Sequence, residues 1–220
     1  HTHCGPTVLP GVVGRRRGTP AYLRRLRRAF EEVALAAWAN REPTRIGTGS
    51  GRASFNINRR LKTPQGVQML PNPEGPCDHE VGVLRIDNAK GEPKAIVMNF
   101  CCHPTTWGDR WISPDYPGFA QKLVEEQYRG KVVTLFTNGA AGDVRPCTVK
   151  GPNPKAFGGG TSRWAVRLGN VLGREVLRVA RTIKTEQHST IKGVSRIARL
   201  PLEKLRTLPQ WYREIREARA

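Results

Sequence analysis

The chain has 220 residues, with 37 basic and 18 acidic side chains and a formal net charge of +19 at pH 7. Hydrophobic residues make up 38% of the sequence, which excludes a disordered chain, and no apolar run approaches the roughly 18 residues that a membrane-spanning helix needs. Glycine and proline are frequent, at 23 and 17 residues, but they show no three-residue period, which excludes collagen.

The first third of the chain predicts one helix, one strand and one loop. Thr19 is a suitable helix cap and Pro20 suits the first turn, and apolar residues then recur at helical spacing as far as Ala37. A strand broken by glycines is expected over 45–59. The proline- and glycine-rich stretch over 63–76 is expected to form a long loop.

The rest of the chain continues to alternate between strands and helices. Thr161 or Ser162 is expected to cap a long helix whose apolar face runs from Trp164 to Ile183. The other predicted elements are a hairpin of strands 81–87 and 94–100, a helix over 119–128 that begins at 113–117, a short buried strand over 131–137, a strand over 191–200 and a final helix from Trp211. This order predicts an α/β fold, a mixed layered sheet with flanking helices.

The two ends of the chain suggest a piece of a longer protein. The sequence starts at His1 without a methionine and stops inside a charged helical pattern over 211–220. We therefore expect an incomplete domain that is truncated at both ends. A signal peptide in front of His1 is compatible with this, and so is a secreted or membrane-associated location.

The positive charge is compatible with nucleic acid or an anionic membrane surface as a partner. The densest arginine cluster, between residues 15 and 28, partly falls on the polar side of the first predicted helix, so a solvated face explains it more simply than a binding patch. No zinc-finger, RNP or clear helix-turn-helix pattern supports nucleic-acid binding.

The five cysteines form no CxxC pair, which indicates neither a redox motif nor a thiolate zinc site. Cys101 and Cys102 are adjacent on a predicted strand. They should therefore point to opposite faces as small packed residues.

Three histidines are candidates for chemistry. His1 and His3 project to the same face if the backbone there is extended, as in a metal or substrate site, although surface or tag-like residues give the same pattern. His103 follows a strand and precedes Pro104, so its ring should lie at a sheet edge, where α/β active sites gather; a core histidine with a satisfied hydrogen bond is the alternative. His79 and His188 have polar surroundings in the sequence and are expected to be exposed.

Two glycine-rich turns are candidates for ligand binding. The turn over 138–143 follows a strand, and its small residues allow backbone N–H groups to approach a ligand, but the lysine and Ser/Thr of a P-loop are missing. The stretch over 157–160 precedes a helix and fits either an anion site or, more simply, a flexible loop.

Six ordered motifs together resemble the catalytic domain of the neutral/alkaline, non-lysosomal ceramidase family. The resemblance is strong over residues 1–146 and diffuse over 147–220, so that 1–220 is expected to form part of one ceramidase-like catalytic domain. The motifs are His-Thr-His-Cys-Gly-Pro (1–6), Asn-Ile-Asn-Arg-Arg (56–60), Val-Gly-Val-Leu-Arg-Ile-Asp (81–87), Asn-Phe-Cys-Cys-His-Pro-Thr-Thr (99–106), Ile-Ser-Pro-Asp-Tyr-Pro-Gly (112–118) and Thr-Asn-Gly-Ala-Ala-Gly-Asp-Val (137–144).

The resemblance implies a zinc-dependent hydrolase of an amide (N-acyl) bond that acts through metal-activated water on a small-molecule or lipid amide such as ceramide. By position, His1 and His103 match two zinc ligands, His3 a candidate proton-transfer group and Arg59 an arginine that faces the active site. The remaining zinc ligands, a glutamate and a tyrosine, are expected outside this chain, so the 220 residues alone are expected to be inactive.

The sequence departs from the family pattern at three positions. Cys4 replaces the usual serine after the second histidine, and Arg60 follows Arg59 where Ser-Pro is more common. Arg145 stands where ceramidases have an active-site serine, and a long cation there changes the volume and charge of the pocket. These departures are compatible with a substrate other than ceramide. They are also compatible with a non-catalytic or repurposed relative that binds an anionic or lipid ligand.

Overall fold

The structure, a computed structural model, describes residues 3–5, 8, 20–107, 111–148, 157–158, 160–187, 190, 192–199 and 207–217. The chain divides into two compact units, His1–His188 and Ser189–Ala220. The second unit contains helix α4 (Leu208–Glu217). The first unit contains helices α1 (Pro20–Ala39), α2 (Asp115–Gln127) and α3 (Ser162–Thr182) and strands β1 (Thr44–Arg52), β2 (Asn56–Asn58), β3 (Leu61–Thr63), β4 (Gly66–Gln68), β5 (Glu80–Asn88), β6 (Pro93–Phe100), β7 (Val133–Asn138) and β8 (Val144–Pro146).

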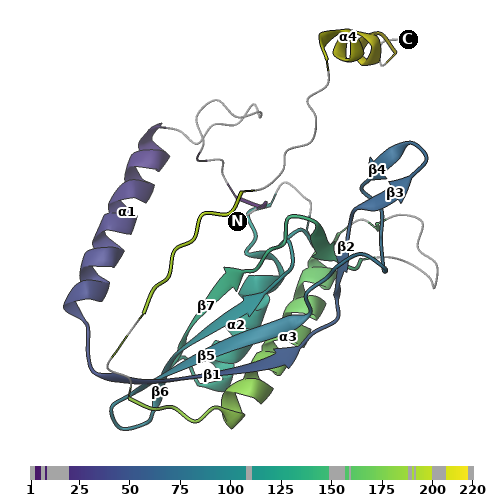
Figure 1. Ribbon diagram of the computed structural model, residues 1–220. Helices are drawn as coiled ribbons and strands as arrows, with labels where there is room; N and C mark the ends of the chain where they lie inside the picture. The colour runs from purple at the N-terminus through teal and green to yellow at the C-terminus, as the bar shows by residue number, and fades with distance from the viewer. Residues whose placement is uncertain are drawn as a thin grey trace. The chain divides into compact units, whose positions relative to one another are not determined.

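A four-stranded mixed sheet forms the centre of the first unit, in the order β1-β5-β6-β7 (Figure 1). β5 pairs antiparallel with both β1 and β6, whereas β6 and β7 are parallel. A parallel pair needs a crossover connection, and α2 supplies it. The carboxyl ends of β6 and β7 therefore meet at one edge of the sheet, with Phe100 opposite Asn138.

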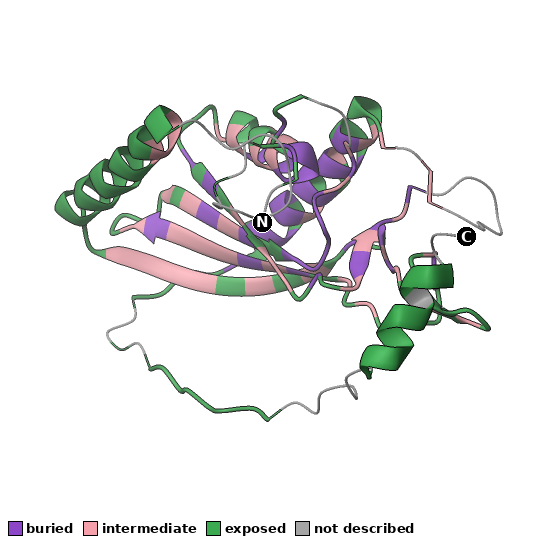
Figure 2. Cartoon of the chain, turned by 90° about the horizontal axis from the view of Figure 1, so that it is seen from above, coloured by how far each residue is buried: buried purple, intermediate pink, exposed green. Residues whose placement is uncertain are grey.

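Helices α2 and α3 lie side by side on one face of this sheet (Figure 1). The buried residues of both helices and of the strands face one another, as Figure 2 shows. An added Cβ at Gly169 of α3 would lie 2.5 Å from Cβ of Phe119 and 2.7 Å from the carbonyl oxygen of Tyr116, so the close approach of the two helices requires glycine. The largest fully buried side chains include Tyr116, Phe100, Ile96, Met98 and Leu172.

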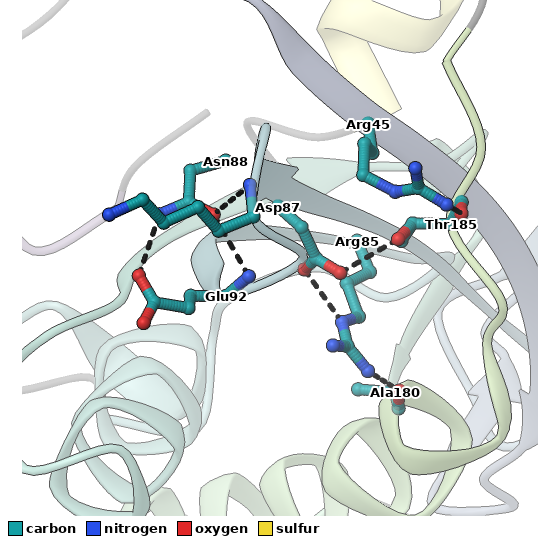
Figure 3. Close-up of polar contacts among 8 residues, drawn as sticks. Arg45, Arg85, Asp87, Asn88, Glu92, Ala180 and Thr185 are labelled. Atoms are coloured by element: carbon teal, nitrogen blue, oxygen red, sulfur yellow. Dashed lines mark hydrogen bonds and ion pairs between the residues drawn. The ribbon is translucent and has the colours of Figure 1, made fainter.

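A buried ion pair joins the sheet to the end of α3 (Figure 3). The Asp87 carboxylate, 1% exposed, accepts from Nε of Arg85 at 2.8 Å and from the Thr185 hydroxyl at 2.8 Å. Arg85 also donates to the carbonyl of Ala180, and Arg45 donates to that of Thr185. Because the partners of Asp87 come from β5 and from the segment that ends α3, and Arg45 of β1 bonds to that same segment, this cluster fixes the helix on the sheet.

Glu175 provides a second link between α3 and the edge strand β1. Its carboxylate accepts from the Arg52 backbone N–H at 2.8 Å and from two nitrogens of Arg178 at 2.7 and 2.9 Å. The hydrogen bonds from Arg178 hold the pKa of Glu175 below its usual range, against the opposing effect of burial. The bond to Arg52 lowers this pKa further.

We expect Glu175 to add stability that depends on pH. A carboxyl whose folded-state pKa is lowered stabilises the fold above its unfolded pKa near 4.5, and this stabilisation is lost as the pH falls through the lower folded value. Glu175→Gln should therefore lower the free energy of unfolding by about 0.5–1 kcal/mol at pH 7. Urea denaturation at pH 7 and pH 3 tests this. An equal difference between the wild type and the variant at both pH values would contradict it.

Most of the predicted elements, and the α/β fold class with a mixed sheet, are confirmed. The hairpin of β5 and β6, the helices α1, α2 and α3 and the helix α4 lie where the sequence placed them, apart from small shifts of their ends. The Thr161 hydroxyl accepts from the Trp164 backbone N–H and caps α3 as predicted. The strand expected over 45–59 is interrupted at 53–55 and forms β1 and β2.

Three local predictions are wrong. Residues 192–199 are irregular, because no strand in the described part of the chain pairs with them, and Val194 and Ile197 are exposed. The expected loop over 63–76 overlaps the β3–β4 hairpin, whose turn is closed by Gly66 at φ +102°. β7 is only partly buried, because Val133 and Leu135 point away from the helices and are exposed.

No helix among the described residues is long and apolar enough to cross a membrane.

Candidate active site

The candidate site lies where β6 and β7 end. β6 continues into Cys101, Cys102 and His103, and β7 continues into the glycine-rich turn that leads to β8. The backbone N–H of Gly139 donates to the carbonyl of Phe100 at 3.1 Å, so the two strand ends stay in register as they leave the sheet. The carboxyl ends of parallel strands are the usual place for a ligand in an open α/β sheet.

The turn after β7 holds the imidazole of His103. Nδ1 of His103 hydrogen-bonds to the carbonyl of Ala141 and, at 3.1 Å, to that of Val144, and its backbone N–H donates to Val144 as well. Carbonyl oxygens only accept, so the proton lies on Nδ1 and the lone pair on Nε2. The residue is buried, at 8% exposure. Metal-binding histidines commonly have this arrangement, with the second ring nitrogen fixed by a carbonyl.

His3 lies against His103. The two ring centroids are 5.4 Å apart, with an angle of 54° between the ring planes. Next to His3, the Cys4 carbonyl accepts from the Ser113 backbone N–H at 3.0 Å, and the Cys4 thiol donates to the Trp107 carbonyl. Partial burial lowers the pKa of His3 below its usual value, and His103 and Arg59 lower it further. The His3 ring therefore loses its proton more readily than a free imidazole.

Asp115 is a site residue that sequence analysis missed. Its carboxylate, 2% exposed, accepts from the Thr106 hydroxyl, from the Trp107 backbone N–H at 3.0 Å and from its neighbour Tyr116 at 2.6 Å. It thereby ties the segment after His103 to the start of α2. Its charge also opposes the lowering of the pKa of His3. Asp115 belongs to the 112–118 motif, but no role was expected of it there, because an acidic residue at a helix start resembles an ordinary N-terminal acid.

The β2–β8 ribbon carries two arginines on one face. Arg145 is paired with Ile57, and Arg59 follows two residues after Ile57, its backbone N–H donating to Asp143 at 2.7 Å. Because side chains alternate along a strand, Arg59 and Arg145 lie on the same face as diagonal neighbours. Burial lowers the pKa of each guanidinium, and Arg59 lowers that of Arg145 as well.

Two buried asparagines support this ribbon. Nδ2 of Asn56 donates to the carbonyls of Asp78 and Cys101, and its Oδ1 lies 2.5 Å from Nδ1 of His79. Asn58 donates to the Pro76 carbonyl and to the Asp143 carboxylate. The Asn-Ile-Asn-Arg motif thus buries its two amides, while Arg59 is half-buried.

The predicted site residues are placed as follows. His3, Arg59 and His103 come together, while His1 lies outside the described residues. The expectation that His79 is exposed is wrong, because its ring is half-buried against Asn56. His188 lies outside the described residues. The 138–143 turn binds the His103 ring with its carbonyls, in the opposite sense to the donor role expected of its N–H groups.

The cysteines take no evident part in chemistry. Cys4, Cys77, Cys101 and Cys102 form no disulfide among the described residues, and Cys101 and Cys102 are packed at 3% and 0% exposure, as predicted. Burial raises the pKa of Cys102 well above its usual range and, together with Cys101, that of Cys77 to about 11. Thiols of this kind stay protonated and are poor nucleophiles and metal ligands.

One described side chain has the donor atom that the implied zinc ion needs. The tautomer of His103 fits a zinc ligand, with its lone pair on Nε2. However, no group of three or more His, Cys, Asp or Glu side chains within the described ranges could hold a metal ion. The described residues alone therefore do not form a complete donor set for zinc.

Comparison with solved structures places this fold among the ceramidases. The neutral ceramidase from Pseudomonas aeruginosa matches 73% of this chain with a TM-score of 0.58 at 22% identity, and a ceramidase complexed with C2 matches 66% with a TM-score of 0.53 at 24% identity. The fold that the sequence motifs implied is thus confirmed. The chain spans 26% and 23% of the length of these two proteins. No family model and no curated protein matches the sequence.

Proposed function

We propose that these residues form one part of a zinc-dependent hydrolase that cleaves the N-acyl bond of a lipid amide. The observation that carries the proposal is the meeting of His3, Arg59 and His103 at the end of the parallel strand pair, in a fold shared with ceramidases. Because the chain spans about a quarter of those proteins, the activity is proposed for a longer chain that contains these residues.

Each residue has a distinct proposed role. His103, through Nε2, and His1 would hold zinc, and a glutamate and a tyrosine outside these 220 residues would complete the site. When bound, zinc supplies Lewis acidity toward water and toward an amide carbonyl. His3 lies against His103 and its lowered pKa favours the neutral ring, so it could accept a proton and pass it to the departing amine. Arg59 would stabilise negative charge that develops on the carbonyl oxygen.

The similar structures and the net charge also favour a class of substrate. Both similar structures are named as ceramidases, which favours a lipid amide. The net charge of +19 favours an anionic membrane surface as the place where such a substrate is met. Ceramide itself is not the substrate that we favour, because Arg145 brings a second cation to the position of the family serine.

Removal of the metal tests the proposal. A longer chain that contains residues 1–220 should hydrolyse N-acyl lipid amides, lose the activity on dialysis against a chelator and regain it with zinc. Magnesium, which prefers oxygen ligands, serves as the control and should not restore activity. Hydrolysis that persists at full rate after complete zinc removal, or folded protein that cleaves no N-acyl amide, would contradict the proposal.

A further inference from the structure

Three buried side-chain atoms lack a hydrogen-bond partner in the described part of the chain: Nε of Arg59, Nε of Arg145 and the hydroxyl of Thr105. All three belong to the candidate site. Thr105 is two residues beyond His103, Arg145 follows the Val144 whose carbonyl bonds to His103, and Arg59 donates to the Gly142 carbonyl in the turn that holds the His103 ring. Buried polar groups are rarely left unpaired, so their gathering at one place points to a ligand.

The two arginines are also short of negative charge. Neither forms an ion pair with a carboxylate of any described residue. Arg59 donates to the Gly142 carbonyl at 2.8 Å. The nearby Asp143 raises the pKa of Arg59 somewhat, but its carboxylate accepts from Asn58 at 3.0 Å. Two adjacent cations without a counterion repel each other, and a bound anion would relieve that repulsion.

The fold holds Arg145 in place. Its guanidinium carbon lies 4.3 Å from the ring centroid of Phe157. The next residue, Gly158, exchanges two hydrogen bonds with Thr148, its backbone N–H donating at 2.8 Å and its carbonyl accepting at 3.2 Å. With one face of the guanidinium on an aromatic ring, its edge remains for planar, bidentate recognition of an oxoanion.

We propose that Arg59 and Arg145 bind an oxoanion group, a carboxylate or a phosphate, that the substrate carries in addition to its amide. The anion site itself is independent of the hydrolase proposal, whereas its assignment to a substrate rests on that proposal. The substitution of arginine for serine at position 145 thus marks a preference for anionic N-acyl compounds over neutral ones.

Titration with inorganic phosphate tests the site directly. At constant ionic strength, the Nε–H signals of Arg59 and Arg145 in an NMR spectrum should shift in a saturable manner. Arg145→Gln should weaken binding at least about tenfold. Arg174→Gln, the same change at an exposed position of α3, should leave the affinity unaltered. Arg145→Lys keeps the charge and should bind with intermediate affinity.

The same titrations can also contradict the anion site. Shifts that grow linearly without saturation, or equal affinities of the Arg145→Gln and Arg174→Gln variants, would overturn the anion site. If the Gln variant fails to fold, the comparison of Arg145→Lys with the wild type decides in the same way. A parallel titration with acetate distinguishes the two sources, since the anion that binds more tightly identifies a carboxylate or a phosphate.

Hydrolysis separates this inference from the proposed function. A longer chain should prefer N-acylglycine or N-acyl phosphoethanolamine over neutral N-acylethanolamine at least about tenfold in kcat/KM, and Arg145→Ser should remove the preference. Saturable phosphate binding without cleavage of any of these compounds would keep the anion site and reject the hydrolase. Cleavage of the neutral compound without phosphate binding would do the reverse.

Discussion

Replacement of His103 by alanine is expected to lower amide hydrolysis by a longer chain more than about 100-fold. Loss of an outer partner of a metal ligand already costs about 10–100-fold, and His103 is proposed as a ligand itself. The structure adds a second reason. The Ala141 and Val144 carbonyls hold the His103 ring in one orientation, and alanine cannot present a ring nitrogen there.

His79→Gln is the matched control for this effect. His79 is half-buried, whereas His103 is buried, and the His79 ring bonds to Asn56; glutamine keeps a hydrogen-bonding group near that amide. Activity within a few-fold of the wild type is expected for the control. Near-normal activity of the folded His103→Ala variant would contradict the proposed role. Circular dichroism of each variant shows whether the fold is retained.

Asp115→Ala is expected to have the largest effect on stability. The change leaves two backbone N–H groups and the Thr106 hydroxyl without their acceptor in a buried place. Each unsatisfied buried group costs about 1–3 kcal/mol, so the free energy of unfolding should fall by about 3 kcal/mol or more. Urea denaturation followed by tryptophan fluorescence measures the loss.

Ser113→Ala provides the comparison for Asp115. Ser113 is buried as well, but among the described residues its hydroxyl accepts one hydrogen bond, from the Asp115 backbone N–H at 3.0 Å. A loss near 1 kcal/mol is expected there. Equal losses for the two variants would show that Asp115 does not act as the shared acceptor that the structure describes.

The parts of the fold that the sequence could predict are those with strong local signals. The long helix α3 has a Thr161 cap and a continuous apolar face, and β5 and β6 alternate around a short turn. The prediction of a strand over 191–200 is wrong because a strand must pair with another strand. The pattern of apolar residues alone does not show whether such a partner exists. The β3–β4 hairpin was not predicted, because a stretch rich in glycine and proline is typical of a loop. Gly66 instead closes a tight turn between two short strands.

Site residues could be predicted from the sequence where a local pattern marks them, such as the end of a strand. They could not be predicted where their role depends on which groups are buried together in the fold. The position of His103 before Pro104 placed it at a sheet edge in advance. Arg59 was also expected at the site, from its motif. The role of Asp115 and the pairing of Arg59 with Arg145 are different, because they depend on contacts between distant segments, such as the β2–β8 register, and on which polar atoms lack a partner. Those relations join residues that are 86 positions apart, as Arg59 and Arg145 are, and have no local signature.

Zinc content per chain tests the central proposal most directly. It should be measured in a longer chain that contains these residues, purified and supplied with zinc, beside its His103→Ala variant. About one zinc per wild-type chain and a large loss in the variant is the predicted result. A folded wild-type protein that binds no zinc, or a variant that binds as much as the wild type, would contradict a zinc site at His103.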